Sequence, residues 1–267
     1  TPSGKPPAKT KERGLTVDPH PSKLPVDWRF AEKQSSVLNR DPFEAEFFTP
    51  DGQADALVRE VIQNSMDARQ SPATPVRVRF VFSGANGAVE SASYTEGLRE
   101  HLLAAGNKVF TAVGSEDMLM RFVTIEDFGT RGLIGDPLQS KDNPPGTTVP
   151  DNFYRFWRNV GRSSKGGNDR GRWGLGKTVF PSSSLINTLW GYTIRADDGR
   201  RLLMGQSVAR IHELGGKTYF PEGFYARFDK TGFQVPFETH KKLPANADPL
   251  CQEMARTRPA PRPTRQR

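Results

Sequence analysis

Apolar residues recur with helical spacing between residues 53 and 70, in the segment QADALVREVIQNSMDARQ. Alanines and long side chains fill this segment and SPATP follows it, which predicts a helix that ends near residue 70. The apolar residues cover more than one side, so we expect the helix to be sandwiched between neighbours rather than to lie on the surface. They are Ala56, Leu57, Val58, Val61, Ile62 and Met66.

Alternation of polar and apolar residues predicts strands further along the chain. PVRVRFVF at 75–82 and MLMRFVTIEDFG at 118–129 each predict one strand. Residues 185–211 predict a hairpin that turns at Asp197-Asp198-Gly199, and 218–228 predict another strand. Short helices are predicted at 95–105 and 152–161, and a third begins within 174–185.

The order of these elements predicts an α+β fold, a two-layer α/β sandwich in which one mixed or antiparallel sheet has helices on one face. We expect a flexible basic segment at 1–25 and one folded domain at 26–240, with a lid loop at about 130–173. Residues 241–267 predict a basic Pro/Arg-rich tail that is disordered or leads into a further part of the protein.

The net charge of +8 is confined to the two ends of the chain. Residues 1–23 carry five Lys/Arg and two acids, residues 241–267 carry seven Lys/Arg and two acids, and the part between them is formally neutral. Basic tails suit DNA or an acidic protein surface as a partner, and they equally suit a solvated segment without a partner. No apolar run approaches a membrane span, so no membrane partner is expected.

A single cysteine, Cys251, excludes an internal disulfide and fits a reducing, cytoplasmic compartment. The first residues, TPSGKPPAKT, contain neither an apolar signal segment nor an initiator Met, which fits a fragment or a processed chain.

Glu60, Asn64 and Asp67 lie at i, i+4 and i+7 of the predicted helix and therefore share one face. An amide oxygen is a suitable ligand for Mg²⁺, and a carboxylate one turn away can orient and deprotonate an attacking water. The same three residues also fit an ordinary solvated stripe on an amphipathic helix. The pattern indicates a ligand site only if the other faces of the helix are buried.

A second group of residues follows the predicted strand at 118–129. In TIEDFGTRGL, Asp127 stands at the strand end, and Gly129 and Gly132 come directly after it. A carboxylate there can accept a hydrogen bond from the amino group of adenine, and glycines permit close approach of the backbone. An ordinary strand-to-loop turn has the same composition.

A glycine-rich cationic segment, RSSKGGNDRGRWGLGKTVF, forms the third group. Backbone N–H groups in such a loop, followed by a helix N-terminus, suit phosphates. Residues Gly171–Thr178 also match the P-loop pattern G-x-x-x-x-G-K-[ST], so a P-loop NTPase is an alternative. The P-loop pattern needs a hydrophobic strand directly upstream, and SSKGGNDR stands there instead.

In their order and spacing, the three groups resemble the GHKL (Bergerat-fold) ATPase superfamily, above all MutL-, MORC- and heat-shock-protein-90-type ATPase domains. REVIQNSMDAR resembles the E-x-x-x-N-x-x-D-A box, DFGTRG the first glycine box and GRWGLGK the second. The first glycine box has one residue more than the usual D-x-G-x-G. The family's late-strand threonine has only Gly216-Lys217-Thr218 as a weak counterpart here.

The resemblance implies ATP and Mg²⁺ as cofactors, with Glu60 as the catalytic base and Asn64 as the Mg²⁺ ligand. It implies a supporting role for Asp67, adenine binding by Asp127, and a base pocket lined by Gly129 and Gly132. Phosphate contacts are implied for the lid residues and those that follow. These are Ser164, Lys165, Gly171, Gly174, Leu175, Gly176, Lys177 and Thr178.

The expected function is slow, Mg²⁺-dependent ATP hydrolysis that drives a conformational or dimerisation switch. The family and the basic tails suggest a homodimer formed on ATP binding, in a DNA-related or bacterial defence machine. A nucleotide-binding regulatory module without significant hydrolysis is the alternative within the same family.

Overall fold

The computed structural model describes residues 26–37, 50–110, 118–159 and 178–239. Its helices are α1 (Pro50–Asp67), α2 (Ala92–Thr95), α3 (Arg99–Ala104), α4 (Asn152–Trp157) and α5 (Val179–Ser182). Its longer strands are β1 (Val26–Glu32), β2 (Arg77–Phe82), β5 (Val123–Phe128), β6 (Thr188–Ile194), β7 (Arg201–Val208) and β9 (Lys217–Phe228). The short strands are β3 (Val89–Glu90), β4 (Leu119–Met120), β8 (His212–Leu214), β10 (Gln234–Val235) and β11 (Phe237–Glu238).

An antiparallel sheet of seven strands forms the centre of the described structure. The long strand β9 pairs with β1 along one edge and with β7 along the other, and β7 continues to β6. The hairpin predicted at 185–211 is confirmed as β6 and β7, with Ile194 opposite Arg201. The predicted strand 218–228 is confirmed as β9.

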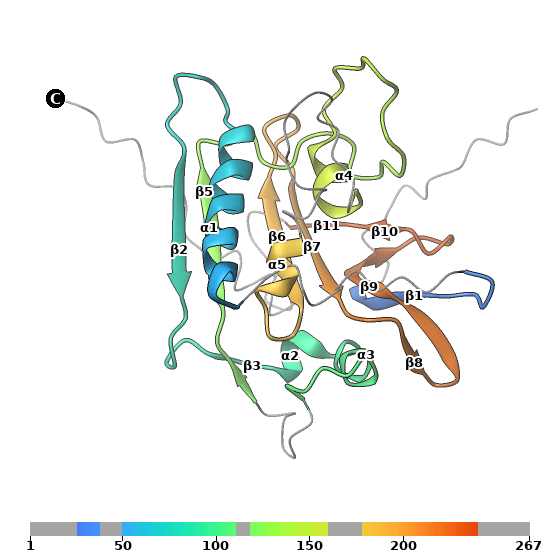
Figure 1. Cartoon of the computed structure of the whole chain (residues 1–267). Coiled ribbons are helices and arrows are strands. Elements are labelled where there is room, and N and C mark those ends of the chain that lie inside the picture. Colours follow the sequence, from blue (N-terminus) through green and yellow to red (C-terminus); the bar gives the residue numbers. More distant parts are fainter. Residues whose placement is uncertain (1–25, 38–49, 111–117, 160–177, 240–267) are drawn as a thin grey trace, which may run out of the picture.

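Both faces of this sheet are covered, because β9 has large apolar residues on both sides. Tyr225 belongs to one face, where it packs with Trp28 against Leu98 and Leu102 at the start and inside of α3. Its neighbours Phe224, Ala226 and Phe228 point to the opposite face, which α4 covers with Phe153 and Trp157. Figure 1 shows α2 with α3 and α4 on separate sides of the strands.

The predicted two-layer α/β sandwich with helices on one face is therefore wrong. Among the described residues, strand accounts for 34% and helix for 21%, and a large antiparallel sheet dominates. The sequence reading also left β1 out entirely, although VDWRFAE pairs along most of β9 and brings Trp28 and Phe30 into the core. The helix at 95–105 is present but shorter than predicted, as α3, and the helix predicted to begin within 174–185 is present as α5.

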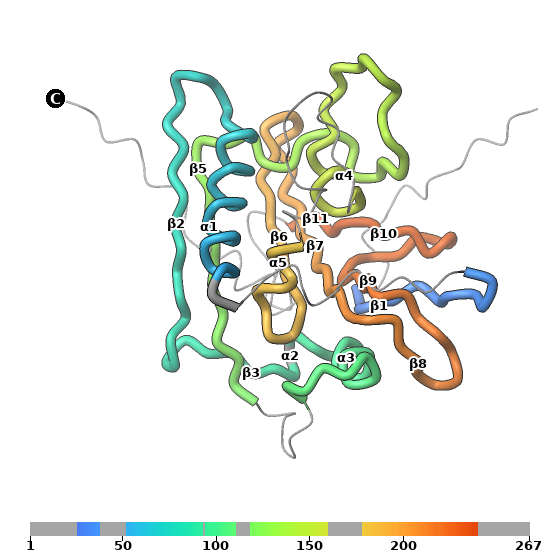
Figure 2. The backbone as a smooth tube through the Cα atoms, viewed as in Figure 1, coloured from blue at the N-terminus to red at the C-terminus, as the bar shows by residue number. Residues whose placement is uncertain are grey.

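A smaller unit lies beside the main sheet and consists of α1 and the antiparallel pair β2–β5 (Figure 1, Figure 2). Val61 and Ser65 are the buried residues of α1 in the described part of that helix. The expectation that α1 is enclosed on several sides is wrong, because Val58, Ile62 and Met66 form an exposed stripe at intervals of four residues. The pattern of Glu60, Asn64 and Asp67 by itself therefore does not indicate a ligand site. None of the described helices is long and apolar enough to span a membrane.

Two histidines join α3 to β8 inside an aromatic cluster. His212 Nδ1 lies 2.8 Å from the Arg210 carbonyl oxygen and therefore carries a proton, so its Nε2 accepts from His101 Nδ1 at 2.8 Å. Phe30 stacks on His101 and Tyr219 stacks on His212. Burial, followed by the neighbouring His212, lowers the pKa of His101 from 6.5 to about 4.

We predict that the folded protein loses stability as the pH falls from about 6.5 to about 4. The unfolded chain binds a proton at His101 at higher pH than the folded chain does, so acid favours unfolding in this window. Thermal unfolding at several pH values measures the effect as a fall in Tm of a few degrees. His101→Phe keeps the stacking on Phe30 and should flatten this slope, and an unchanged slope would contradict the assignment.

Candidate functional site

The polar face of α1 that carries Glu60 and Asn64 is directed toward α5. Both residues are half-buried, and Asn64 Nδ2 donates a hydrogen bond to Glu60 Oε1 at 3.2 Å. Gln53, seven residues before Glu60, lies on the same face, and its amide donates to the Ser182 carbonyl of α5. The predicted shared face of Glu60 and Asn64 is therefore present, and Gln53 on the same side of α1 contacts the last residue of α5.

Asp67 ends α1 on the same side but plays a different part. The residue is exposed, and its carbonyl oxygen accepts a hydrogen bond from Arg131 Nη2 at 3.0 Å. Asp67 therefore contributes through its backbone to the contact between α1 and the loop after β5.

Backbone hydrogen bonds join the C-terminus of α1 to the loop that follows β5. Arg131 N donates to Ala68 O at 2.7 Å and Gln70 N donates to Gly129 O at 2.9 Å, with Arg69 and Thr130 forming an antiparallel bridge between them. These bonds bring together the first two groups of residues that the sequence singled out, although about 60 residues separate them along the chain.

Asp127 occupies the end of β5 on the face that α1 covers. Its carboxylate accepts hydrogen bonds from Ser65 of α1 and from Thr130. Desolvation raises the pKa of Asp127 despite these two bonds, which act in the opposite direction. The residue is still accessible to solvent, so its carboxylate is recessed among protein atoms while remaining open to a ligand.

Gly129 and Gly132 shape the loop after β5. Both have positive φ, at 78° and 66°, where a side chain is disfavoured. A Cβ on Gly129 would overlap the Pro75 carbonyl oxygen, and one on Gly132 would overlap the Ile194 carbonyl oxygen. Close contact with neighbouring backbone therefore explains both glycines, and their predicted place in a base pocket stays a prediction.

The glycine-rich segment lies outside the described residues. That holds for Ser164, Lys165, Gly171, Gly174, Leu175, Gly176 and Lys177. Thr178 is described and stands at the N-terminal end of α5, directly before Val179.

Sequence reasoning missed two hydroxyl side chains at this junction. Ser65 is only 4% exposed and bonds Asp127. Thr193 of β6 is 7% exposed, and its Oγ1 accepts a hydrogen bond from Leu133 N at 2.8 Å, so it anchors the loop after β5. The weak candidate Thr218 instead pairs with Glu213 in the β8–β9 hairpin. The sequence could have indicated Thr193, because it lies on a predicted strand two residues after Gly191.

Metal binding at this site depends on few protein ligands. Within the described ranges, no three His, Cys, Asp or Glu side chains are grouped to hold a metal ion. Asn64 could act as a Mg²⁺ ligand through Oδ1, since its bond to Glu60 is made by the amide nitrogen. Mg²⁺ commonly takes most of its ligands from water and phosphate, so a single amide oxygen suffices on the protein side.

Comparison with protein-family models, with curated proteins and with solved structures finds no match for this chain. The resemblance to GHKL ATPases therefore rests on the short sequence motifs, and the function has to be argued from the site.

We predict that Asp127→Asn weakens ATP binding about tenfold or more, because a carboxylate accepts from an amino group more strongly than an amide does. The raised pKa of Asp127 means that folding disfavours its charged form. Because Asn carries no charge, the Tm of Asp127→Asn at pH 7 should not fall below that of the parent protein. Calorimetric titration with ATP and Mg²⁺ and a thermal melt provide the two measurements.

The matched control is Glu126→Gln, which changes the adjacent carboxylate on the opposite face of β5, where it pairs with Arg79. This variant should keep the ATP affinity of the parent protein. If Asp127→Asn and Glu126→Gln bind ATP with equal affinity, Asp127 is not part of the ATP site.

Proposed function

We propose that this protein binds ATP with Mg²⁺ at the junction of α1 and the end of β5 and hydrolyses it slowly. The observation that supports this most is the contact between two distant segments. Glu60, Asn64 and Ser65 come from one of them, and Asp127 and Gly129 come from the other. Each segment alone has an ordinary structural explanation. A ligand site built from both segments requires that they lie side by side, as they do here.

The Asp127 end of the junction suits adenine. Its carboxylate is accessible, recessed and oriented by Ser65 and Thr130, so one oxygen can receive a hydrogen bond from an exocyclic amino group without moving. Burial of part of its surroundings strengthens such a bond relative to the same bond in water.

The Glu60 and Asn64 end suits the phosphates. Mg²⁺, when bound, neutralises phosphate charge and orients the transferred group. Asn64 Oδ1 is the atom that would hold it, and the hydrogen bond from Asn64 Nδ2 holds Glu60 within reach of the same region. Glu60 would accept the proton of the attacking water, which is the task of a general base.

The switch function is proposed from the glycine-rich, cationic composition of residues 162–177. Residues Ser164 to Lys177 would close on the phosphates, and their contacts would differ between ATP and ADP, which is what a nucleotide-driven change of conformation requires. A homodimer formed on ATP binding, a DNA or protein partner for the basic tails, and a role in bacterial defence belong to this proposal by family resemblance.

We predict that Glu60→Ala binds ATP with nearly unchanged affinity but turns it over about 100-fold more slowly, the usual loss for a missing general base. Single-turnover hydrolysis with and without Mg²⁺, together with calorimetric ATP binding, measures both quantities. Asp55→Ala is the matched control, because Asp55 is an exposed acid on the other side of α1.

Three results would change the conclusion. ATP binding without turnover in the parent protein would indicate a regulatory nucleotide-binding module. Normal turnover in Glu60→Ala would remove Glu60 as the base. Loss of activity in Lys177→Ala, with Glu60→Ala and Asp127→Asn fully active, would favour the P-loop NTPase.

A further inference from the structure

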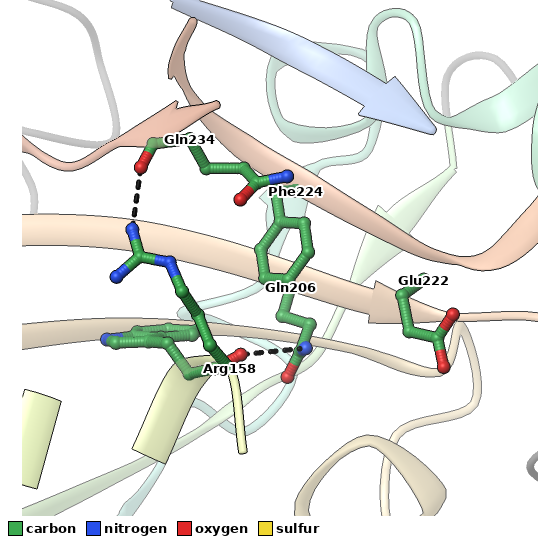
Figure 3. Close-up of a pocket in the computed structure, with 6 residues that line it drawn as sticks. Arg158, Gln206, Glu222, Phe224 and Gln234 are labelled. Carbon is green, nitrogen blue, oxygen red and sulfur yellow. Dashed lines mark hydrogen bonds between the residues drawn. The ribbon is translucent and has the colours of Figure 1, made fainter. Parts of the chain in front are cut away.

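A cavity of about 360 Å³ opens beyond the C-terminal end of α4, away from the junction described above. Its lining residues are Trp157, Arg158, Gln206, Glu222, Phe224 and Gln234. Figure 3 shows Arg158 toward one end and Glu222 toward the other, with Gln206 and Phe224 between them. The cavity lies within the volume range of small-molecule binding sites.

The floor of the cavity is the α4-facing side of β7 and β9. Side chains alternate along a strand, so Gln206 shares this face with Leu202 and Met204, and Glu222 shares it with Phe224 and Ala226. The strand register places Gln206 opposite Phe224 and pairs Val208 with Glu222. Two polar side chains therefore stand where the same strands elsewhere carry core residues, in the region that α4 stops short of covering.

Gln206 is built into the cavity as a hydrogen-bond acceptor. The residue is 6% exposed, and its Nε2 donates to the Trp157 carbonyl oxygen at 3.5 Å (Figure 3). That bond uses one of the two amide N–H groups, and the amide oxygen is the acceptor that remains for a ligand.

Glu222 is the second acceptor. Its carboxylate has no hydrogen bond or ion pair with any described side chain. Burial raises the pKa of Glu222, which means that the surroundings disfavour its charge. Glu222 is half-buried, and a backbone N–H offsets only part of its desolvation. A carboxylate in such a core-facing strand position costs free energy unless a cation or a further hydrogen-bond donor meets it.

Arg158 does not serve as that cation. Its Nη1 donates to Pro137 O at 2.7 Å and its Nη2 to Gln234 O at 2.6 Å, and the guanidinium lies over the Phe233 ring at 4.5 Å. Asp136 offsets part of its charge. Arg158 is therefore held as a wall of the cavity by carbonyl groups that engage Nη1 and Nη2, while its buried Nε has no hydrogen-bond partner among the described residues.

We propose that this cavity binds a small organic cation that carries a guanidinium or a primary amine. The charged group would donate to Glu222 and to the Gln206 oxygen, and its aliphatic part would lie on the Phe224 ring. A carboxylate at the floor would repel phosphates, so this site is separate from the proposed ATP site and does not depend on it.

Titration with butylguanidinium and with its neutral analogue butylurea, followed by ¹⁵N NMR of the parent protein, tests the proposal. Butylguanidinium should shift the amide signals of Gln206 and Glu222 in a saturable way, and butylurea should bind at least about tenfold more weakly, since only the former gives charge-assisted hydrogen bonds. Glu222→Gln and Gln206→Leu should each weaken binding of butylguanidinium by a similar factor.

Glu213→Gln is the control variant, because Glu213 is an exposed acid in the adjacent β8–β9 hairpin, and it should bind like the parent protein. Glu222→Gln should keep or raise the Tm, since it removes a disfavoured charge, so a folded variant is available for comparison. Equal binding of the two probes, no saturable shift, or unchanged binding in Glu222→Gln would each overturn the proposal.

Discussion

The hydrogen bonds between the end of α1 and the loop after β5 are the constraint on which the candidate chemistry depends. Arg131 N to Ala68 O and Gln70 N to Gly129 O satisfy backbone groups at the point where α1 ends. They set the position of Asp127 relative to Ser65, and with it the distance between the adenine end and the phosphate end of the proposed site. Without this junction, the Glu60 face would be a polar stripe on a helix.

Among the described residues, desolvation raises the pKa of two carboxylates, Asp127 and Glu222, and they differ in their hydrogen-bond partners. Asp127 accepts from the hydroxyl groups of Ser65 and Thr130, which offset part of its desolvation. Glu222 lacks such partners among the described side chains and faces a cavity instead. Desolvated polar groups of this kind cost stability, so each marks a place where function is a better explanation than packing.

The fold class was predicted wrongly for a reason that is visible in β9. A strand with one covered face alternates between apolar and polar residues, whereas YFPEGFYARF has aromatic residues on both sides. That pattern indicates layers on both faces, as the structure has with α3 on one side and α4 on the other. The strand β1 escaped notice because Asp27, Arg29 and Glu32 make VDWRFAE look polar, although its inward residues Trp28 and Phe30 are core.

The sequence alone determined the local elements and the chemistry of the residues in them. The helix that carries Glu60 and Asn64, the strand that ends in Asp127 and the β6–β7 hairpin were all predictable, because periodicity and turn residues depend on neighbouring backbone. Tertiary structure decided which of them meet. The Ser65–Asp127 contact, the anchor at Thr193 and the pairing of Gln206 with Phe224 across β7 and β9 join segments that are distant in sequence. Such contacts follow from packing summed over the whole core, and no local pattern encodes that sum.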